Sequence, residues 1–216
     1  MIRQFGRGML IAFSISLLLV CGLQTMSRAS FPDDMKGPKE AALNSAMRKL
    51  WEDHITWTRV FIISAVAGLP DKDAATQRLL QNQVDIGNAI KPFYGNAAGD
   101  QLTALLKDHI VIAADVVTAA KANDKPKLDD ANKRWSDNAD QIAAFLSKAN
   151  PKNWPENEMR TMLHDHLKLT TNEAVARIQG DWAADVKAYD AVHEEILHMA
   201  DGLSMGIVKQ FPDKFK

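Results

Sequence analysis

A six-residue pattern that occurs three times decides the fold of this chain: Leu50-Trp51-Glu52-Asp53-His54-Ile55, Leu105-Leu106-Lys107-Asp108-His109-Ile110 and Met162-Leu163-His164-Asp165-His166-Leu167. Each copy has two apolar residues, a variable residue, an Asp-His pair and a further apolar residue. The copies are 55 and 57 residues apart. Self-similarity at a period of this length indicates a structure assembled from repeated units.

Each of the three histidines lies on an apolar stripe with helical spacing. The first stripe contains Met47, Trp51, His54, Thr58, Phe61 and Ala65. Steps of three and four residues put these side chains on one face of a helix, and strand-like alternation is absent. Clusters of helix breakers separate the periodic segments, at residues 68–71, 92–99, 123–126, 150–155 and 179–181. The sequence therefore predicts an all-α fold: a six-helix up-and-down antiparallel bundle built from three αα-hairpin repeats, in a domain of residues 40–216.

The first 29 residues have the pattern of a secretory signal peptide. Arg3 and Arg7 precede an apolar run from Met9 to Leu23, and Ser27-Arg28-Ala29 offers small residues to a signal peptidase. The run is shorter than the roughly 20 residues that a transmembrane helix needs, which favours a cleaved signal peptide. An uncleaved membrane tether is the alternative. Residues 30–39 contain two prolines and a glycine, which predicts a flexible tether. The expected location is extracytoplasmic, either periplasmic or secreted.

Composition excludes several kinds of partner and site. Without residues 1–29 the chain has 23 basic and 27 acidic side chains, and it has no basic stripe, so we expect no nucleic-acid partner. Cys21, the only cysteine, lies in the predicted signal peptide. Disulfides and thiolate metal sites are therefore not expected in the mature protein. Any metal would need nitrogen and oxygen ligands.

Polar residues of the repeats are expected to meet in one layer of the bundle. Two residues on antiparallel helices have the same height when both are equally far from the turn. That condition holds for three pairs: His54 with Asp85, His109 with Asp137, and His166 with Asp190. Asp190 and His193 fit the apolar stripe of the last helix. Asp85 and Asp137 lie on the flanks of their helices, where two other polar residues are more central, Asn82 and Asn138.

Three interpretations of this His/Asp layer are open. In the first, each histidine is bonded to an Asp or Asn of the neighbouring helix and the layer is a structural polar core. In the second, the layer binds one or two divalent ions (Zn, Fe or Mn) through His54, His109, His166, His193, Asp85, Asp137 and Asp190. In the third, it borders a pocket for a small organic ligand, with apolar walls from Trp51, Trp57, Tyr189 and Trp182.

The predicted function is accordingly an exported helical bundle that binds a divalent metal ion or a small ligand at the layer. The alternative is a non-catalytic structural or partner-binding bundle. The chain has no glycine-rich phosphate loop, no Gly-x-Ser-x-Gly and no His-Glu-x-x-His, so the common hydrolase and nucleotide-enzyme classes have no support. Whether the protein is an enzyme is left open.

The chain resembles a family of small bacterial helical proteins that has no established activity. The resemblance lies in residues 50–59, residues 78–90 and Gln210-Phe211-Pro212, and it covers about residues 48–216. Members are labelled glycosyltransferase or acetylglutamate kinase. Both labels imply enzymes with α/β folds, which the all-helical pattern contradicts, so we expect neither to apply. The resemblance implies no catalytic residues.

Overall fold

The computed structural model describes residues 37–216, which form six α-helices and one short 3-10 helix. Their bounds are α1 Pro38–Ala67, α2 Lys72–Tyr94, α3 Asn96–Lys121, α4 Lys125–Ala149, α5 Glu156–Gln179, α6 Trp182–Gln210 and η1 Pro212–Lys214. No strand occurs within this range. The predicted all-α fold is confirmed. The predicted signal peptide and most of the predicted tether fall on residues 1–36, outside the described residues.

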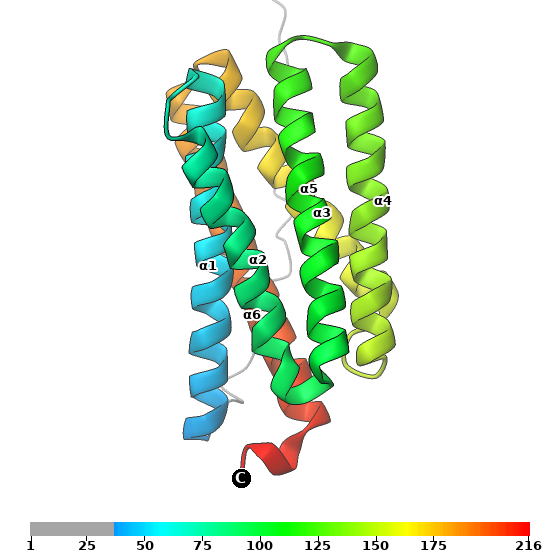
Figure 1. Ribbon diagram of the computed structural model, residues 1–216. Coiled ribbons are helices and arrows are strands. Elements are labelled where there is room, and N and C mark those ends of the chain that lie inside the picture. The colour runs from blue at the N-terminus through cyan, green and yellow to red at the C-terminus, as the bar shows by residue number, and fades with distance from the viewer. Residues whose placement is uncertain (1–36) are drawn as a thin grey trace, which may run out of the picture. The chain divides into compact units, whose positions relative to one another are not determined.

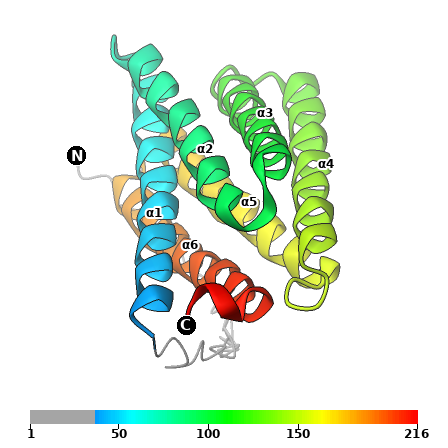
Figure 2. The ribbon, with the colours of Figure 1, turned by 60° about the horizontal axis from the view of Figure 1, so that its bottom comes forward.

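The helices run up and down and close into a ring (Figures 1 and 2). Each helix packs against the one before and the one after it, and α6 returns to pack against α1. The pairs α1–α2, α3–α4 and α5–α6 are the three predicted hairpins. Helices α1, α3 and α5, which carry the repeated histidine motif, also contact one another across the ring. This arrangement turns the three motifs toward a common axis.

Helix α1 begins two residues before the predicted start at Glu40. Proline is favoured in the first turn of a helix because its ring fixes a helical φ and its missing N–H needs no partner there. Pro38 has this position, and the Glu40 carboxylate accepts a hydrogen bond from the backbone N–H of Gly37 at 3.1 Å. Pro38 and Lys39 therefore belong to the helix and not to the tether.

Helices α2 and α3 are joined by a much tighter turn than predicted. Helix α2 continues through Pro92 to Tyr94, and α3 begins at Asn96, so only Gly95 separates them. Gly99 lies inside α3, where a Cβ atom on it would come within 2.6 Å of the Gly87 carbonyl oxygen. The two glycines therefore allow the helix backbones to approach closely near this turn. Away from it, α2 and α3 diverge (Figures 1 and 2).

The bundle has two ends that differ in what they hold. We call the end with the turns inside the hairpins, near residues 68–71, 122–124 and 180–181, the hairpin end. The opposite end, where α2 meets α3 and α4 meets α5, is the linker end. Most of the large apolar core lies toward the linker end, and a smaller cluster lies at the hairpin end: Phe61, Ile62, Leu79, Ile110, Val117 and Ala174. Among residues 37–216, no helix is long and apolar enough to cross a membrane.

Candidate functional site

Three histidines from the repeated motif meet between the two ends. His54 of α1, His109 of α3 and His166 of α5 are 3%, 4% and 5% exposed. The ring centroids of His54 and His166 are 5.7 Å apart, and His109 is close enough to both for electrostatic interaction. We call these three residues the histidine layer. The structure brings them together at one height, as the distances to the turns indicated.

His109 uses both of its ring nitrogens. Asn138 donates its amide N–H to the Leu105 carbonyl at 3.1 Å, and its Oδ1 atom lies 2.8 Å from His109 Nδ1. Trp135 Nε1, which can only donate, is 3.1 Å from His109 Nε2. The partners therefore assign the proton to Nδ1 and leave Nε2 as the acceptor. His109 is a neutral imidazole with no free lone pair.

His54 has a different kind of partner. The Gln83 amide nitrogen is 3.3 Å from His54 Nδ1, and it is also 2.8 Å from the Leu79 carbonyl oxygen. The same nitrogen is 3.1 Å from Asn82 Oδ1, so its two N–H groups face three possible acceptors, and this contact does not fix the tautomer of His54. The Gln83 carbonyl oxygen is buried without a partner.

His166 pairs with a carboxylate. Its Nδ1 atom lies 2.8 Å from Oε2 of Glu195, whose other oxygen is buried without a partner. In all three hairpins the partner follows the histidine by 29 residues, as Gln83, Asn138 and Glu195. The spacing is constant while the chemistry of the partner changes. The sequence reasoning identified only Asn138 of these three, and this constant spacing is the signal that could have found the other two.

Burial keeps two members of the histidine layer neutral. Desolvation, helped by His166 and His109, holds the pKa of His54 well below its ordinary value. Desolvation, together with His166, lowers the pKa of His109 to about 4. Both imidazoles are therefore uncharged near neutral pH. For His109 this agrees with the tautomer that its hydrogen bonds assign.

The three predicted aspartates do not join the histidines. Asp85 is half-buried and accepts from Gln81, and exposed Asp137 pairs with Lys133 at 2.6 Å. Asp190 is exposed on α6, because the buried stripe of this helix contains Val192, Ile196 and Met199 and not the predicted set with Asp190. Successive residues of a helix are rotated by about 100°, so a residue one or two places from the buried stripe points away from the core. The prediction that the aspartates share the layer is wrong for this geometric reason.

The other predicted site residues are also dispersed. His193 is half-buried, and its Nε2 atom lies 3.0 Å from Glu52 on α1. Among the predicted aromatic walls, Trp51 is in the core, but Trp182 is 59% exposed. Trp57 and Tyr189 each lie under an arginine, at 5.4 Å and 4.7 Å from ring centroid to guanidinium carbon. They therefore do not form one pocket.

The predicted metal-ligand set is not assembled. Within residues 37–216, no group of three or more His, Cys, Asp or Glu side chains is placed to hold a metal ion. His109 would have to give up Trp135 or Asn138 to offer a lone pair. The nearest carboxylate, Glu195, is already bonded to His166. Metal binding at the histidine layer stays a prediction that this arrangement does not favour.

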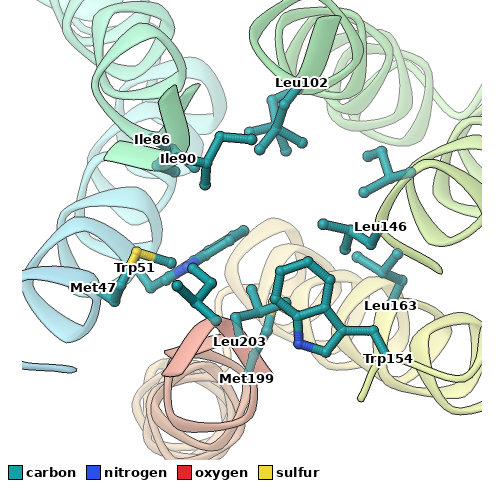
Figure 3. Close-up of a pocket in the computed structure, with 13 residues that line it drawn as sticks. Met47, Trp51, Ile86, Ile90, Leu102, Leu146, Trp154, Leu163, Met199 and Leu203 are labelled. Atoms are coloured by element: carbon teal, nitrogen blue, oxygen red, sulfur yellow. The ribbon is translucent and has the colours of Figure 1, made fainter. Parts of the chain in front are cut away.

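On the linker side of the histidine layer the core is closely packed. Figure 3 shows labelled side chains from all six helices, and Trp154 from the α4–α5 turn, pointing toward one another around the axis. They leave a pocket of only about 20 Å³. Gly206 makes room for Trp154, because a Cβ atom there would lie 2.0 Å from the indole nitrogen.

On the hairpin side of the histidine layer there is a larger cavity, of about 100 Å³. It is lined by α1 to α5, with aliphatic side chains predominating, and no charged side chain lines it. Trp135, the donor to His109, forms part of its wall. Asn132 of α4 and Val175 of α5 are lining residues that are exposed to solvent. The cavity therefore reaches the surface between these two helices.

One residue that lines this hairpin-end cavity has a buried hydroxyl without a partner. Thr170 lines the cavity, one helical turn from His166, and is 6% exposed. Its hydroxyl makes no hydrogen bond. The neighbouring Thr58 and Thr171 donate to the carbonyls of His54 and Leu167, each at 2.8 Å. Thr170 is thus the one threonine of this wall with an unused hydroxyl.

The hairpin end also holds a buried charge network that the sequence reasoning missed. Arg59 of α1 contacts Glu173 of α5 at 2.7 Å and Asp185 of α6 at 2.9 Å, and both carboxylates are 1% exposed. Burial raises the pKa of Glu173 to about 7 despite its contact with Arg59. These residues lie between the repeated motifs, so the pattern of the repeats could not have identified them.

Comparisons with protein-family models, with curated proteins and with solved structures gave no match. The resemblance to a family of small helical proteins therefore stays a prediction.

Proposed function

We propose that this protein binds a small, mostly apolar molecule in the hairpin-end cavity, beside the histidine layer. The observation that carries the proposal is the size of that cavity, about 100 Å³, compared with about 20 Å³ for the apolar pocket at the linker end. Protein interiors are otherwise packed like organic crystals. The empty volume is therefore a feature that needs an explanation.

An unused cavity is costly to keep. Enclosed core volume costs about 24 cal/mol per Å³, so roughly 2 kcal/mol is the upper limit of the destabilisation by a cavity of this size that reaches the surface. A ligand that fills the space recovers part of this energy through dispersion contacts. Apolar cavities of about 150 Å³ bind benzene or xenon, so a molecule of about five non-hydrogen atoms is a suitable size here.

The position of the cavity supports a binding site as its explanation, in preference to a defect in the packing. Its exposed lining residues, Asn132 and Val175, lie between α4 and α5, which gives a small molecule a route in. On the side of the histidine layer the wall includes Trp135, whose indole N–H donates to His109 at 3.1 Å. The cavity is therefore bounded by a wall that hydrogen bonds hold in place.

A methyl NMR titration with 2-methylbutane tests the proposal. We expect saturable shifts for methyl groups that line the cavity, such as those of Ile62, Leu79 and Val117. Methyl groups around the linker-end pocket, such as those of Ile142 and Ile207, are expected to stay unchanged.

A filling variant and a matched control complete this test. Ala174→Leu places a larger side chain in the cavity wall and should abolish the shifts. Ala104→Leu adds the same side chain at an exposed position of α3 and should leave them intact. Absence of saturable shifts in the unmodified protein would reject the proposal.

Divalent metal binding by His54, His109 and His166 is the second candidate. The convergence of the three imidazoles favours it, and the bonds of His109 to Trp135 and Asn138 oppose it. A metal site would raise the melting temperature with the logarithm of free Zn, Fe or Mn concentration. Replacing all three histidines should then abolish bound metal. An unchanged melting temperature with each ion would leave the histidine layer as a hydrogen-bonded polar core.

The proposal includes an extracytoplasmic location, on the ground of residues 1–29. We expect protein purified from its host to begin at Ser30, which mass spectrometry can determine. An intact Met1 would instead indicate a membrane-tethered form.

A further inference from the structure

We infer that the hairpin-end cavity takes the end of an alkyl chain, about five carbons deep, while the polar head of the same molecule stays in solvent outside α4 and α5. This inference rests on the proposed function, because it assumes that the cavity is a binding site. It adds the class of the ligand, an amphiphile with a hydrocarbon chain, and the side of the bundle from which the ligand enters.

Away from its mouth, the cavity offers a ligand no free polar group. Thr58 and Thr171 donate to backbone carbonyls, each at 2.8 Å, and Trp135 donates to His109 at 3.1 Å. The unpaired Thr170 hydroxyl is covered by neighbouring atoms, so it is not open to the cavity. A polar group that entered would lose its hydrogen bonds to water without replacement, whereas burial of hydrocarbon is favourable. The part of the ligand that enters is therefore hydrocarbon.

The cavity has its mouth between α4 and α5, where a longer molecule can extend into solvent. Asn132 of α4 and Val175 of α5 both line the cavity and are both exposed. Helix α5 begins beside α4 at the linker end and crosses toward α1 and α6, so α4 and α5 diverge toward the hairpin end (Figures 1 and 2). Val175 gives the mouth an apolar edge and Asn132 a polar one. This arrangement suits a molecule that is apolar at one end and polar at the other.

The size of the cavity also favours a chain end over a whole molecule. A volume of about 100 Å³ has room for about five non-hydrogen atoms. A free hydrocarbon of this size makes all of its contacts inside the cavity. A chain end makes the same contacts, and the carbons that follow it contact Val175 at the mouth while the head keeps its water. An amphiphile therefore uses both the cavity and its exposed apolar edge.

A series of n-alkyl glucosides, from propyl to octyl, tests the inference. Dissociation constants are measured from the methyl NMR shifts of Ile62, Leu79 and Val117, below the concentration at which each glucoside forms micelles. We expect binding to tighten about fourfold for each added carbon up to about five, the effect of burying one methylene group, and by less than about twofold per carbon beyond that length. A steady fourfold gain through octyl glucoside would indicate nonspecific association and contradict the inference. Much weaker binding of octyl than of pentyl glucoside would also contradict it, because the cavity would then accept only an enclosed molecule.

A variant at the mouth and a matched control test the side of entry. Val175→Trp narrows the mouth and should weaken octyl glucoside by about tenfold, whereas 2-methylbutane, which fits inside, should keep its dissociation constant within about twofold. Val111→Trp makes the same change at a position of α3 that is 54% exposed and does not line the cavity, so both probes should bind as they do to the unmodified protein. Asn132→Trp narrows the mouth from α4 and serves if Val175→Trp does not fold.

The outcomes separate the inference from the proposed function. If 2-methylbutane binds and no alkyl glucoside does, the inference is wrong and the proposed function stands. The same holds if Val175→Trp and Asn132→Trp leave the binding of octyl glucoside unchanged, or if Val111→Trp weakens it as much as Val175→Trp. If neither 2-methylbutane nor any glucoside binds the unmodified protein, the proposed function itself fails.

Discussion

The linker end and the hairpin end of this bundle are built from the same three hairpins but are packed differently. At the linker end, two tryptophans and many aliphatic side chains leave a pocket of about 20 Å³. At the hairpin end, where α2 and α3 have diverged, smaller side chains line a cavity of about 100 Å³. One end therefore provides most of the apolar packing, and the other keeps space at a cost in stability.

The buried polar groups of the linker end and the hairpin end also differ. At the linker end these groups are neutral: Asn150 donates to the Gly206 carbonyl at 2.9 Å, Ser204 donates to that of Ala200 at 2.6 Å, and the Trp51 indole N–H has no partner. The hairpin end contains the buried carboxylates Glu173 and Asp185 and the unpaired hydroxyl of Thr170. The histidine layer therefore separates an end with neutral buried polar groups from an end whose buried carboxylates and larger cavity are typical of a binding site.

The largest effect is expected where the two ends meet. His109→Ala removes a side chain bonded to Trp135 and Asn138 and leaves a hole between the two cavities. We expect a loss of about 3–5 kcal/mol in the free energy of unfolding, measured by urea denaturation. His164→Ala changes a histidine of the same motif that is 39% exposed, and it should cost less than about 1 kcal/mol. Similar losses in the free energy of unfolding for both variants would show that the histidine layer does not stabilise the region where the two ends meet.

The second-largest effect is expected when a buried alanine is replaced by leucine at each end of the bundle. Ala143 is fully buried at the linker end, and a leucine there has no free volume, so Ala143→Leu should cost about 1–3 kcal/mol. Ala174 lines the hairpin-end cavity, so Ala174→Leu should be neutral or stabilising by up to about 1 kcal/mol. Urea denaturation of both variants measures the contrast. Equal destabilisation would contradict the difference in packing.

Opposite pH dependences should distinguish the histidine layer from the hairpin-end network. The pKa of His109 is lowered to about 4 from 6.5, so its contribution to stability is present above pH 6.5 and is lost as the pH falls toward 4. The pKa of Glu173 is raised to about 7 from 4.5, so its contribution is present below pH 4.5 and is lost as the pH rises through 7. The two groups therefore oppose each other between pH 4.5 and 6.5.

A variant separates these two contributions. Glu173→Gln removes the carboxyl that gains a proton in the folded state, so the loss of stability from pH 6.5 to 4.5 should become steeper. The change in slope should be up to about 1.4 kcal/mol per pH unit, the value for one proton. Chemical denaturation at four or five pH values gives the slope. An unchanged slope would mean that Glu173 titrates normally.

The smallest effect should come from Thr170→Val, which replaces an unpaired hydroxyl by a methyl group of similar shape. In the absence of ligand we expect a gain of about 1 kcal/mol, because a buried polar group without a partner is removed. Thr171→Val removes a bonded hydroxyl and should lose about 1 kcal/mol or less. A loss for both variants would indicate that Thr170 already has a partner in solution.

The sequence was sufficient for the helices and for the meeting of the histidines. Apolar stripes determine which face each helix buries, and distances from the turns determine the heights of His54, His109 and His166. The height of a residue in the bundle does not determine the direction in which its side chain points. Asp85 and Asp137 have the predicted heights but lie beside the buried stripe, where Gln83 and Asn138 take their places.

The hairpin-end cavity could not be predicted in the same way. It depends on the divergence of α2 and α3 and on the sum of side-chain volumes from five helices, and neither follows from the pattern of one helix. The unpaired hydroxyl of Thr170 could not be predicted from the pattern of its helix either. Its neighbour Thr171 is the same residue type on the same helix, and only the tertiary arrangement distinguishes them.

A crystal structure of the protein under xenon pressure tests the central claim most directly, because xenon occupies apolar cavities of this kind. We expect xenon in the hairpin-end cavity, in contact with Phe61, Ile110 and Ala174, and none in the linker-end pocket. Xenon at the linker end, or no xenon at the hairpin end, would contradict the division of the bundle into a packed end and a binding end.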